Sequence, residues 1–310
     1  MDALADLLQG VRARGALFSR SVMSPPWGLE FRNPARLTLC TMLSDEAWLV
    51  PAEGEPRRLR AGDVALVRGP QVYRVADRPD TPPGVIVLDA ERCVRPDGSD
   101  VCEEVCLGPR TFGDSADGPA VLASGSYQVA GDISERLLSA LPPVLVVPDD
   151  QGPCDLLRRL GEEIGTDAPG QQLVLDRLLD LMLVLTLRCW FDMPEANPPA
   201  WYRALSDPVA GAALRALHAS PARAWTVAAL AAEVGVSRAT LARRFTELVG
   251  EPPLTYLTGW RMALAADLLR DPDETVARVA KRVGYADGFA FSSAFKRTRG
   301  VSPSVHRVAG

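Results

Sequence analysis

The pattern of apolar and polar positions changes along the chain from a strand-like period to a helix-like one. Within residues 1–150, short apolar runs such as 37–43 and 64–67 are separated by turn-forming clusters such as 53–56 (EGEP). Several short strands at this spacing are typical of a β-sandwich or barrel. Beyond residue 150 the apolar positions recur at helical spacing, and 171–191 is apolar almost all round.

We expect two helices within residues 151–199, over about 155–164 and 171–191, followed by a linker at 192–199 (DMPEANPP). A helix that is apolar on most sides must be buried against something. These helices could cap the β domain, or they could form the seam of a homodimer. Both interpretations stay open, and we expect a homodimer that these helices build or support.

An internal repeat occupies the last third of the chain, residues 206–310. The segment 227–236 (VAALAAEVGV) aligns with 276–285 (VARVAKRVGY) at an offset of 49, and the offset becomes 50 after the glycine. Such self-similarity indicates two copies of one supersecondary unit. The copies are predicted over about 226–248 and 275–299.

Each copy has the features that a helix-turn-helix requires. A small residue, Ala231 or Ala280, lets two helices approach closely. A glycine, Gly235 or Gly284, supplies the left-handed turn between them. A single copy would also fit a generic helical hairpin, whereas two copies favour a tandem helix-turn-helix domain.

The helices of this domain have recognisable ends. Ser237 is an expected N-cap of the second helix in the first copy, and Asp287 has the same place in the second copy. Between the copies, 252–269 (PPLTYLTGWRMALAADLL) is predicted as one long connecting helix.

Composition and charge narrow the class of protein. The chain has 310 residues, of which 47% are hydrophobic and 24% charged, so it can bury a sizeable core. Residues 1–205 hold 20 Arg and 30 Asp or Glu, whereas 206–310 hold 14 Arg or Lys and 9 Asp or Glu. The basic C-terminal part is therefore expected to meet a polyanion. The first residues lack a signal sequence and 173–191 carries four charges, so we expect a soluble, cytoplasmic protein with no membrane partner.

Residues 207–307 resemble the DNA-binding domain of the AraC/XylS family of transcription regulators. The repeat carries this resemblance together with 284–307 (GYADGFAFSSAFKRTRGVSPSVHR), which matches the closing signature of the family. The resemblance implies a sequence-specific regulator of double-stranded DNA, an activator that works with RNA polymerase. It also implies that two recognition helices enter successive major grooves.

The resemblance also implies which residues contact DNA. In the first copy, Arg243 is the best candidate for bidentate readout of guanine, while Thr240 and Arg244 could reach phosphates. In the second copy Phe289 stands at a base-facing position, where we expect contacts with thymine methyl groups and weaker sequence discrimination; the alternative for Phe289 is a core aromatic. The expected contact residues are Ser237, Arg238, Ala239, Thr240, Ala242, Arg243 and Arg244, then Phe289, Ser292, Ser293, Lys296 and Arg297, the last two anchoring the backbone.

Residues 1–150 resemble the cupin-type sensor domain that is often joined to this DNA-binding unit, on 59–67 (LRAGDVALV) and on 121–147, which ends in an LPPV pattern. The predicted fold class is therefore an α+β multidomain protein. It would combine an N-terminal cupin-like β-barrel (1–150), a helical dimerisation segment with its linker (151–199) and a C-terminal all-α tandem helix-turn-helix domain (206–310).

The cupin resemblance does not extend to catalysis. Catalytic cupins hold a metal with histidines and a carboxylate, but the two histidines of this chain, His218 and His306, both lie in the last third. We therefore expect no enzyme and no cofactor. The alternative is a cupin-type enzyme or small-molecule-binding protein with secondary DNA binding. A non-specific DNA-coating protein is disfavoured by the net charge of −5.

Two kinds of signal could act on the sensor domain. A small-molecule effector could bind inside the barrel, near Trp48 and Tyr73. Alternatively, Cys93, Cys102 and Cys106, which fall within 14 residues, could sense oxidants or electrophiles or could bind zinc, although their spacing is not a standard zinc pattern. The third interpretation is that these cysteines are inert.

Overall fold

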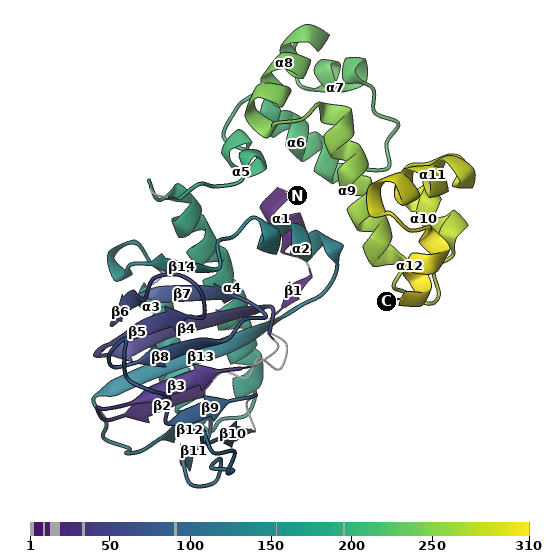
Figure 1. Ribbon diagram of the computed structural model, residues 1–310. Helices are drawn as coiled ribbons and strands as arrows, with labels where there is room; N and C mark the ends of the chain where they lie inside the picture. Colours follow the sequence, from purple (N-terminus) through teal and green to yellow (C-terminus); the bar gives the residue numbers. More distant parts are fainter. Residues whose placement is uncertain are drawn as a thin grey trace. The chain divides into compact units, whose positions relative to one another are not determined.

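A computed structural model describes residues 3–8, 10–12, 19–32, 35–89, 92–152, 154–194 and 196–309. The chain divides into two compact units (Figure 1). The β unit comprises Val11–Val129 and Leu141–Ala196, and the helical unit comprises Met1–Gly10, Ala130–Ala140 and Asn197–Gly310. Among the helices described, none is long and apolar enough to cross a membrane.

The β unit is built from short strands joined by turns, as the alternating pattern predicts. Its strands are β1 (Val11–Arg12), β2 (Ser19–Met23), β3 (Gly28–Phe31), β4 (Leu37–Ser44), β5 (Glu46–Pro51), β6 (Arg57–Arg60), β7 (Val64–Arg68), β8 (Tyr73–Ala76), β9 (Val85–Val87), β10 (Cys93–Val94), β11 (Cys106–Gly108), β12 (Thr111–Gly113), β13 (Ala120–Val129) and β14 (Val144–Val147).

These strands form two sheets. The first has the order β11-β12-β2-β13-β4-β7-β14, with β1 also paired to β13, and the second has the order β10-β9-β3-β8-β5-β6. The long strand β13 pairs antiparallel with both β2 and β4. Side chains that point inward from the two sheets, including Met42, Leu49 and Leu122, make one hydrophobic core. This two-sheet arrangement confirms the predicted β-rich N-terminal fold.

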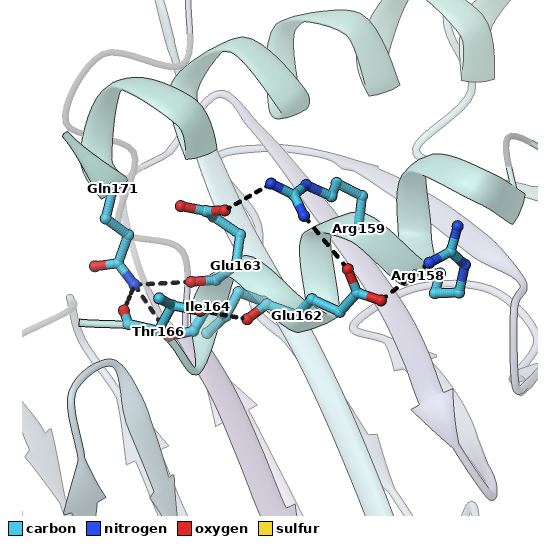
Figure 2. A network of polar contacts seen from close by, with 7 residues as sticks. All are labelled: Arg158, Arg159, Glu162, Glu163, Ile164, Thr166 and Gln171. Atoms are coloured by element: carbon cyan, nitrogen blue, oxygen red, sulfur yellow. Dashed lines mark hydrogen bonds and ion pairs between the residues drawn. The ribbon is translucent and has the colours of Figure 1, made fainter. Parts of the chain in front are cut away.

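Two helices of the β unit follow the last strand, namely α3 (Cys154–Ile164) and α4 (Gln171–Asp192), after a short 3₁₀ turn at Asp149–Gln151. Figure 2 shows how their junction is held. The Gln171 side-chain amide donates to the carbonyls of Glu163 (2.8 Å), Ile164 and Thr166, which lie at or just past the end of α3. Carbonyls at a helix end lack intrahelical partners, so this amide satisfies groups that would otherwise need water.

The outer surface of α3 near this junction carries ion pairs. Arg158 and Arg159 approach Glu162 at 3.0 and 3.5 Å, and Arg159 also approaches Glu163 at 3.6 Å (Figure 2). Exposed pairs at this helical spacing contribute only tenths of a kcal/mol each, roughly 0.3–0.5. These ion pairs are typical of a solvent-exposed helix face and contribute little to stability.

The helix α4 is the almost uniformly apolar segment of the sequence. One side is buried within the β unit through residues such as Leu179, Met182 and Leu187, and the Leu179 carbonyl accepts a hydrogen bond from the Tyr127 hydroxyl of β13 at 2.9 Å. The other side leaves Leu173 and Leu181 exposed, at 59% and 46%. Capping of the β domain therefore accounts for one face of α4 but not for the other.

The helical unit contains the remaining elements. Its helices are α1 (Ala3–Leu7), α2 (Asp132–Ser139), α5 (Ala200–Ala204), α6 (Ala210–Ala219), α7 (Val227–Glu233), α8 (Arg238–Val249), α9 (Pro253–Leu268), α10 (Val276–Arg282), α11 (Gly288–Arg299) and α12 (Pro303–Ala309). The pairs α7–α8 and α10–α11 coincide with the two predicted helix-turn-helix copies, and α9 is the predicted connecting helix.

This division differs from the domain boundaries expected at residues 150 and 206. The helix α2 lies in the sequence between strands β13 and β14, yet it belongs to the helical unit. It buries Ile133, Leu137 and Leu138, and its Arg136 lies over the Tyr256 ring of α9 at 6.0 Å. The short helix α1 also packs in this unit, on α2 and α6. Both helices therefore belong to a different unit from the strands that flank them in sequence.

Candidate nucleic-acid interface

The first helix-turn-helix is fixed at its ends by side-chain caps. The Thr226 hydroxyl accepts a hydrogen bond from the Ala229 N–H at 3.0 Å and begins α7, and the Ser237 hydroxyl accepts from the Thr240 N–H at 3.1 Å and begins α8. Gly235 lies between the helices with φ of +74°, a left-handed conformation that favours glycine. The expected N-cap role of Ser237 is confirmed.

The second helix-turn-helix repeats this construction. The Thr275 hydroxyl accepts from the Arg278 N–H at 3.2 Å and begins α10, and the Asp287 carboxylate accepts from the Phe289 and Ala290 N–H groups at 3.0 and 3.1 Å and begins α11. Gly284, with φ of +84°, makes the turn. The expected N-cap role of Asp287 is confirmed as well.

The helix α9 connects the two copies through their cores. Its first half, with Tyr256 and Leu257, packs in the same cluster as Leu241 and Phe245 of α8. A second cluster holds Met262, Ala265, Ala266 and Leu269 from the other half of α9 and the next residue, together with Phe291 and Phe295 of α11. At 16 residues the helix is about 24 Å long. Both helix-turn-helix copies therefore pack on the same continuous helix, α9.

The chain's two histidines support this scaffold. His218 is buried, with Nδ1 at 2.7 Å from the Asp6 carboxylate of α1 and Nε2 at 2.8 Å from the Tyr256 hydroxyl of α9. Its ring lies 4.3 Å from the Trp260 ring. His306 lies at 5.4 Å from the Phe295 ring. The hydrogen bond between Asp6 and His218 joins α1 to α6 within the helical unit, and sequence reasoning missed it because 212 positions separate the two residues.

The predicted contact residues of α8 fall on one accessible face. Arg238, Ala239 and Arg243 are exposed and Ala242 and Thr240 are half-buried, whereas Leu241 and Phe245 point into the core. The Arg243 guanidinium lies 3.1 Å from Glu247 one turn further along, in a pair that is more than half exposed. Because such a pair is weak, Arg243 is accessible to another acceptor.

Arg244 differs from its neighbours. Its guanidinium donates to the Asp207 carboxylate at 2.6 and 2.8 Å, and this hydrogen bond holds the pKa of Asp207 below its usual range. Asp207 also accepts from the Val209 and Ala210 N–H groups just before and at the start of α6. Arg244 thus ties α8 to α6, which sequence reasoning missed.

The predicted contact residues of α11 are also accessible. Phe289 is 86% exposed, so its side chain is not a core aromatic. Ser293, Lys296 and Arg297 are exposed and Ser292 is half-buried. A large apolar ring at the solvent-facing start of a helix has few stabilising contacts in the free protein.

Asp267 of α9 has an unpredicted structural role. Its carboxylate accepts hydrogen bonds from the Asp132 and Ile133 N–H groups, at 2.5 and 3.3 Å, and so caps the N-terminus of α2 from a distance of 135 positions. Burial raises the pKa of Asp267. The Asp132 carboxylate in turn faces the Arg299 guanidinium at 3.3 Å. The segment between β13 and β14 is therefore held on α9 by polar contacts as well as apolar ones.

In the β unit, a cavity of about 630 Å³ lies between the sheets, with Trp27, Phe31 and Ser124 among its lining. The residues suggested for an effector pocket are not part of that lining. Tyr73 is buried in the core, where its ring stacks on Phe31 at 4.8 Å and its hydroxyl meets the Cys40 thiol at 3.6 Å. Trp48 is half-buried on β5.

The three cysteines considered as sensors occupy different environments. Cys93 is buried in β10, and burial together with Cys102 raises its pKa to about 12. The Cys93 N–H lies 2.9 Å from the Cys102 Sγ, whereas Cys106 is exposed on β11. Among the described residues, no three His, Cys, Asp or Glu side chains are grouped so that they could hold a metal ion.

Known protein families match both the N-terminal and the C-terminal part of the chain. The family described as "Cupin" matches residues 2–192, and the family described as "Helix-turn-helix domain" matches residues 230–308. An AraC-like transcription regulator from Streptomyces lividans is 33% identical, over 99% of this chain and 98% of its own. Its counterpart from Streptomyces antibioticus is 32% identical over the same shares. A solved structure of the AdpA DNA-binding domain in complex with a target DNA is 36% identical, covers 34% of this chain and 93% of its own, and has a TM-score of 0.32.

Both Streptomyces relatives bear the name of AraC-like transcription regulators, and each matches this chain along nearly its whole length, through the β-rich and the helical parts alike. The two capped helix-turn-helix copies on one connecting helix agree with that assignment. The chain is a member of the AraC family of DNA-binding transcription regulators, with an N-terminal cupin domain and a C-terminal helix-turn-helix domain.

Proposed function

We propose that this regulator binds its operators as a cytoplasmic homodimer and activates transcription with RNA polymerase when a small molecule occupies the β unit. Each copy would place α8 and α11 in successive major grooves. The observation that carries the DNA part is the pair of accessible recognition faces on one connecting helix. The groove repeat is about 34 Å, and a helix of about 24 Å suits two recognition helices held apart on that scale.

The two recognition helices would divide the work of reading DNA. Arg243, with Arg238 and Ala239 on the same face of α8, would read bases, and its guanidinium would make a bidentate contact with guanine. On α11 the exposed Phe289 would contact thymine methyl groups, while Lys296 and Arg297 would hold phosphates. Ser292 and Ser293 are too short for bidentate readout, so discrimination by α11 would be weaker.

The exposed side of α4 supports the homodimer. Leu173, Val174 and Leu181 are 38–59% exposed on a helix whose other side is buried in its own unit. Covering these side chains with a second copy would remove apolar surface from water. Sedimentation at micromolar concentration should give a dimer, and Leu173→Glu with Leu181→Glu should give a folded monomer. A monomer with and without DNA for the unaltered chain would contradict the proposal.

The cavity between the sheets supports a small molecule as the signal, because a space of this size suits a compound of drug-like dimensions. The alternative is a signal at Cys93, Cys102 and Cys106. The raised pKa of Cys93 disfavours its reactive thiolate, whereas Cys106 is exposed. Replacing all three cysteines by serine should leave the response of target transcription to oxidant, electrophile and zinc unchanged. A lost response would favour the cysteines.

The operator is best identified by sequencing DNA fragments that the protein occupies in the cell. We expect a motif of two half-sites, each with one strongly specified and one weakly specified segment. The matched control is a chain with Arg238→Ala and Arg243→Ala, which should lose the strongly specified segments. Fragments without a shared motif would instead indicate non-specific coating of DNA.

A further inference from the structure

The cavity of the β unit has two chemically different walls. It lies between the first sheet, on the side of β2, β13 and β4, and the second sheet, on the side of β3 and β9. Its volume is about 630 Å³. The wall from the first sheet carries five Ser and Thr residues, whereas the wall from the second sheet is mostly apolar, and this difference is the basis for inferring a class of ligand.

The wall from the first sheet carries several hydroxyl groups beside apolar side chains such as Met23 and Phe112. Ser19 and Ser21 of β2, Thr38 of β4, and Ser124 and Ser126 of β13 all line the cavity. In the sheet register Ser124 lies opposite Ser19, and Ser126 lies opposite Thr38, so these five residues form a contiguous patch, which we call the hydroxyl wall. Inward-pointing positions further along the same strands, such as Leu122 and Met42, belong to the hydrophobic core. The hydroxyl wall is therefore confined to the cavity.

Part of the hydroxyl wall is short of hydrogen-bond partners. In the described part of the chain, the hydroxyl groups of Ser19, Ser21 and Ser124 have no hydrogen bond to another side chain or to the backbone. None of the three is among the fully buried unpaired atoms, so they face the cavity, where they can exchange water for a ligand. A ligand with matching oxygen atoms would supply the missing partners.

The opposite wall is mostly apolar, and its one buried unpaired donor among the described residues is the Trp27 indole N–H. It consists of Trp27, Leu29 and Phe31 at and before β3, and Val85 and Val87 of β9. The Phe31 ring is held in place by stacking on Tyr73, with an angle of 7° between the rings. Branched aliphatic and aromatic side chains of this kind suit the face of a planar ring system.

The charges around the cavity disfavour an anionic ligand. Three charged residues contribute to the lining, namely Arg36, Asp89 and Asp114, and two of them are acidic. The Asp114 carboxylate accepts a hydrogen bond from the Ser24 N–H at 3.1 Å. The hydroxyl wall itself contains no charged side chain. Arg36 is the one cation among the described lining residues and two carboxylates line the same cavity, so a carboxylate ligand would gain little net charge compensation there.

From these walls we infer that the ligand is an uncharged, flat aromatic or polycyclic compound that carries several hydroxyl or carbonyl oxygens along one side. Its ring faces lie against Trp27 and Phe31, and its oxygens hydrogen-bond with Ser19, Ser21 and Ser124. This inference rests on the proposed control of the regulator by a small molecule, and it names the chemical class of that molecule.

Calorimetric titration of the full chain tests this class with three probes: the flavonol quercetin, which is flat and polyhydroxylated, dodecanoate, which is apolar and anionic, and glucose, which is polar and not aromatic. We expect quercetin to bind at micromolar concentration and the other two to bind at least tenfold more weakly. Tighter binding of dodecanoate or glucose would overturn the inferred class.

Substitutions on the hydroxyl wall locate the binding. Ser19→Ala with Ser124→Ala should weaken quercetin about tenfold, through the loss of two hydrogen bonds. Ser44→Ala is the matched control, since Ser44 lies on β4 outside the cavity and bonds to the Pro119 carbonyl. Ser21→Ala alone, with an expected loss of about threefold, serves if the double variant does not fold. Equal affinities in all these variants would overturn the inference.

A parallel measurement of DNA affinity separates this inference from the proposed function. If quercetin binds and depends on the hydroxyl wall but leaves DNA affinity unchanged, the ligand class stands and the effector role fails. If no probe of this class binds while dodecanoate alters DNA affinity, the ligand class fails and control by a small molecule stands.

Discussion

The two helix-turn-helix copies share a scaffold but present different surfaces. Thr226 and Thr275 begin their first helices with the same cap, and Phe245 and Phe295 fill the same core position. On the outward face, however, Ala239 of α8 corresponds to Phe289 of α11 at the offset of 50. Positions that set the helix geometry have been kept alike, whereas positions that face outward have diverged.

The charges of the two recognition helices are also arranged differently. In α8 the arginines Arg238 and Arg243 stand in the first two turns, and Glu247 follows them. In α11 the corresponding first turns hold Gly288 and Ser293, and the positive charges come later, at Lys296 and Arg297. The same scaffold can therefore carry one helix suited to reading bases and another suited to holding the DNA backbone.

The largest expected effect is on the free energy of unfolding when a turn glycine is replaced, because the space around the glycine differs between the two copies. A Cβ on Gly284 would lie 2.5 Å from the Ala222 carbonyl oxygen, whereas a Cβ on Gly235 meets nothing within 4 Å. Both residues have positive φ, so alanine costs about 1–2 kcal/mol at either. Gly284→Ala should cost about 3 kcal/mol or more because the backbone must also shift. Urea unfolding of Gly235→Ala and Gly284→Ala measures the two losses of unfolding free energy. Equal losses would contradict the expectation that Gly284 is the more tightly packed turn.

The next effect concerns base readout by α8. Arg243→Ala should cost about 1–3 kcal/mol in binding to the preferred operator and should relax the preference at one base position. Lys296→Ala is the matched control, since a phosphate contact should weaken all sequences alike and lower the salt slope by about one. Binding assays on a library of single-base operator variants would reveal both patterns. If Arg243→Ala leaves affinity and preference intact, the division between α8 and α11 is wrong.

A smaller effect is expected for the apolar residue that distinguishes α11. Phe289→Ala should weaken operator binding by about 1 kcal/mol and should abolish the difference between thymine and uracil at one position, since uracil lacks the methyl group. Its folding stability should not fall, because 86% of the side chain is exposed. Val308→Ala, at 88% exposure, controls for the loss of any exposed apolar group. Retained discrimination against uracil in Phe289→Ala would contradict the proposed contact.

The smallest effect concerns an ion pair found in only one copy. Arg244 pairs with Asp207, whereas the corresponding residue of α11, Ala294, is buried in the core. The pKa of Asp207 is lowered in the folded state by the hydrogen bond from Arg244, so the unfolded chain takes up this proton first as the pH falls. The contribution to stability is therefore present above the unfolded pKa, about 4, and is lost as the pH falls through the lower folded value. Asp207→Asn should make stability less sensitive to acid below about pH 4, and an unchanged profile would exclude the pair as a contributor.

Much of the helical unit could be predicted from the sequence because its signals are local. The caps at Ser237 and Asp287 act on N–H groups two or three residues away, and the left-handed turns at Gly235 and Gly284 need only one residue each. Because the unit occurs twice, each cap and each turn glycine also appears in both copies, which makes the pattern easier to recognise. The β-rich fold was predictable from alternation, but the cavity was not: its hydroxyl wall assembles from three strands whose pairing no local pattern specifies.

The sequence by itself determined the two helix-turn-helix copies, their connecting helix and the family to which the chain belongs. Only the tertiary structure decided that α1 and α2 belong with the helical unit, that Asp267 caps α2, and that Arg244 is held by Asp207. The reason is the separation of the partners along the chain. A cap or turn forms between residues that are neighbours in sequence, whereas Asp267 and the Ile133 N–H are 134 positions apart and meet only because the tertiary fold brings α9 and α2 together.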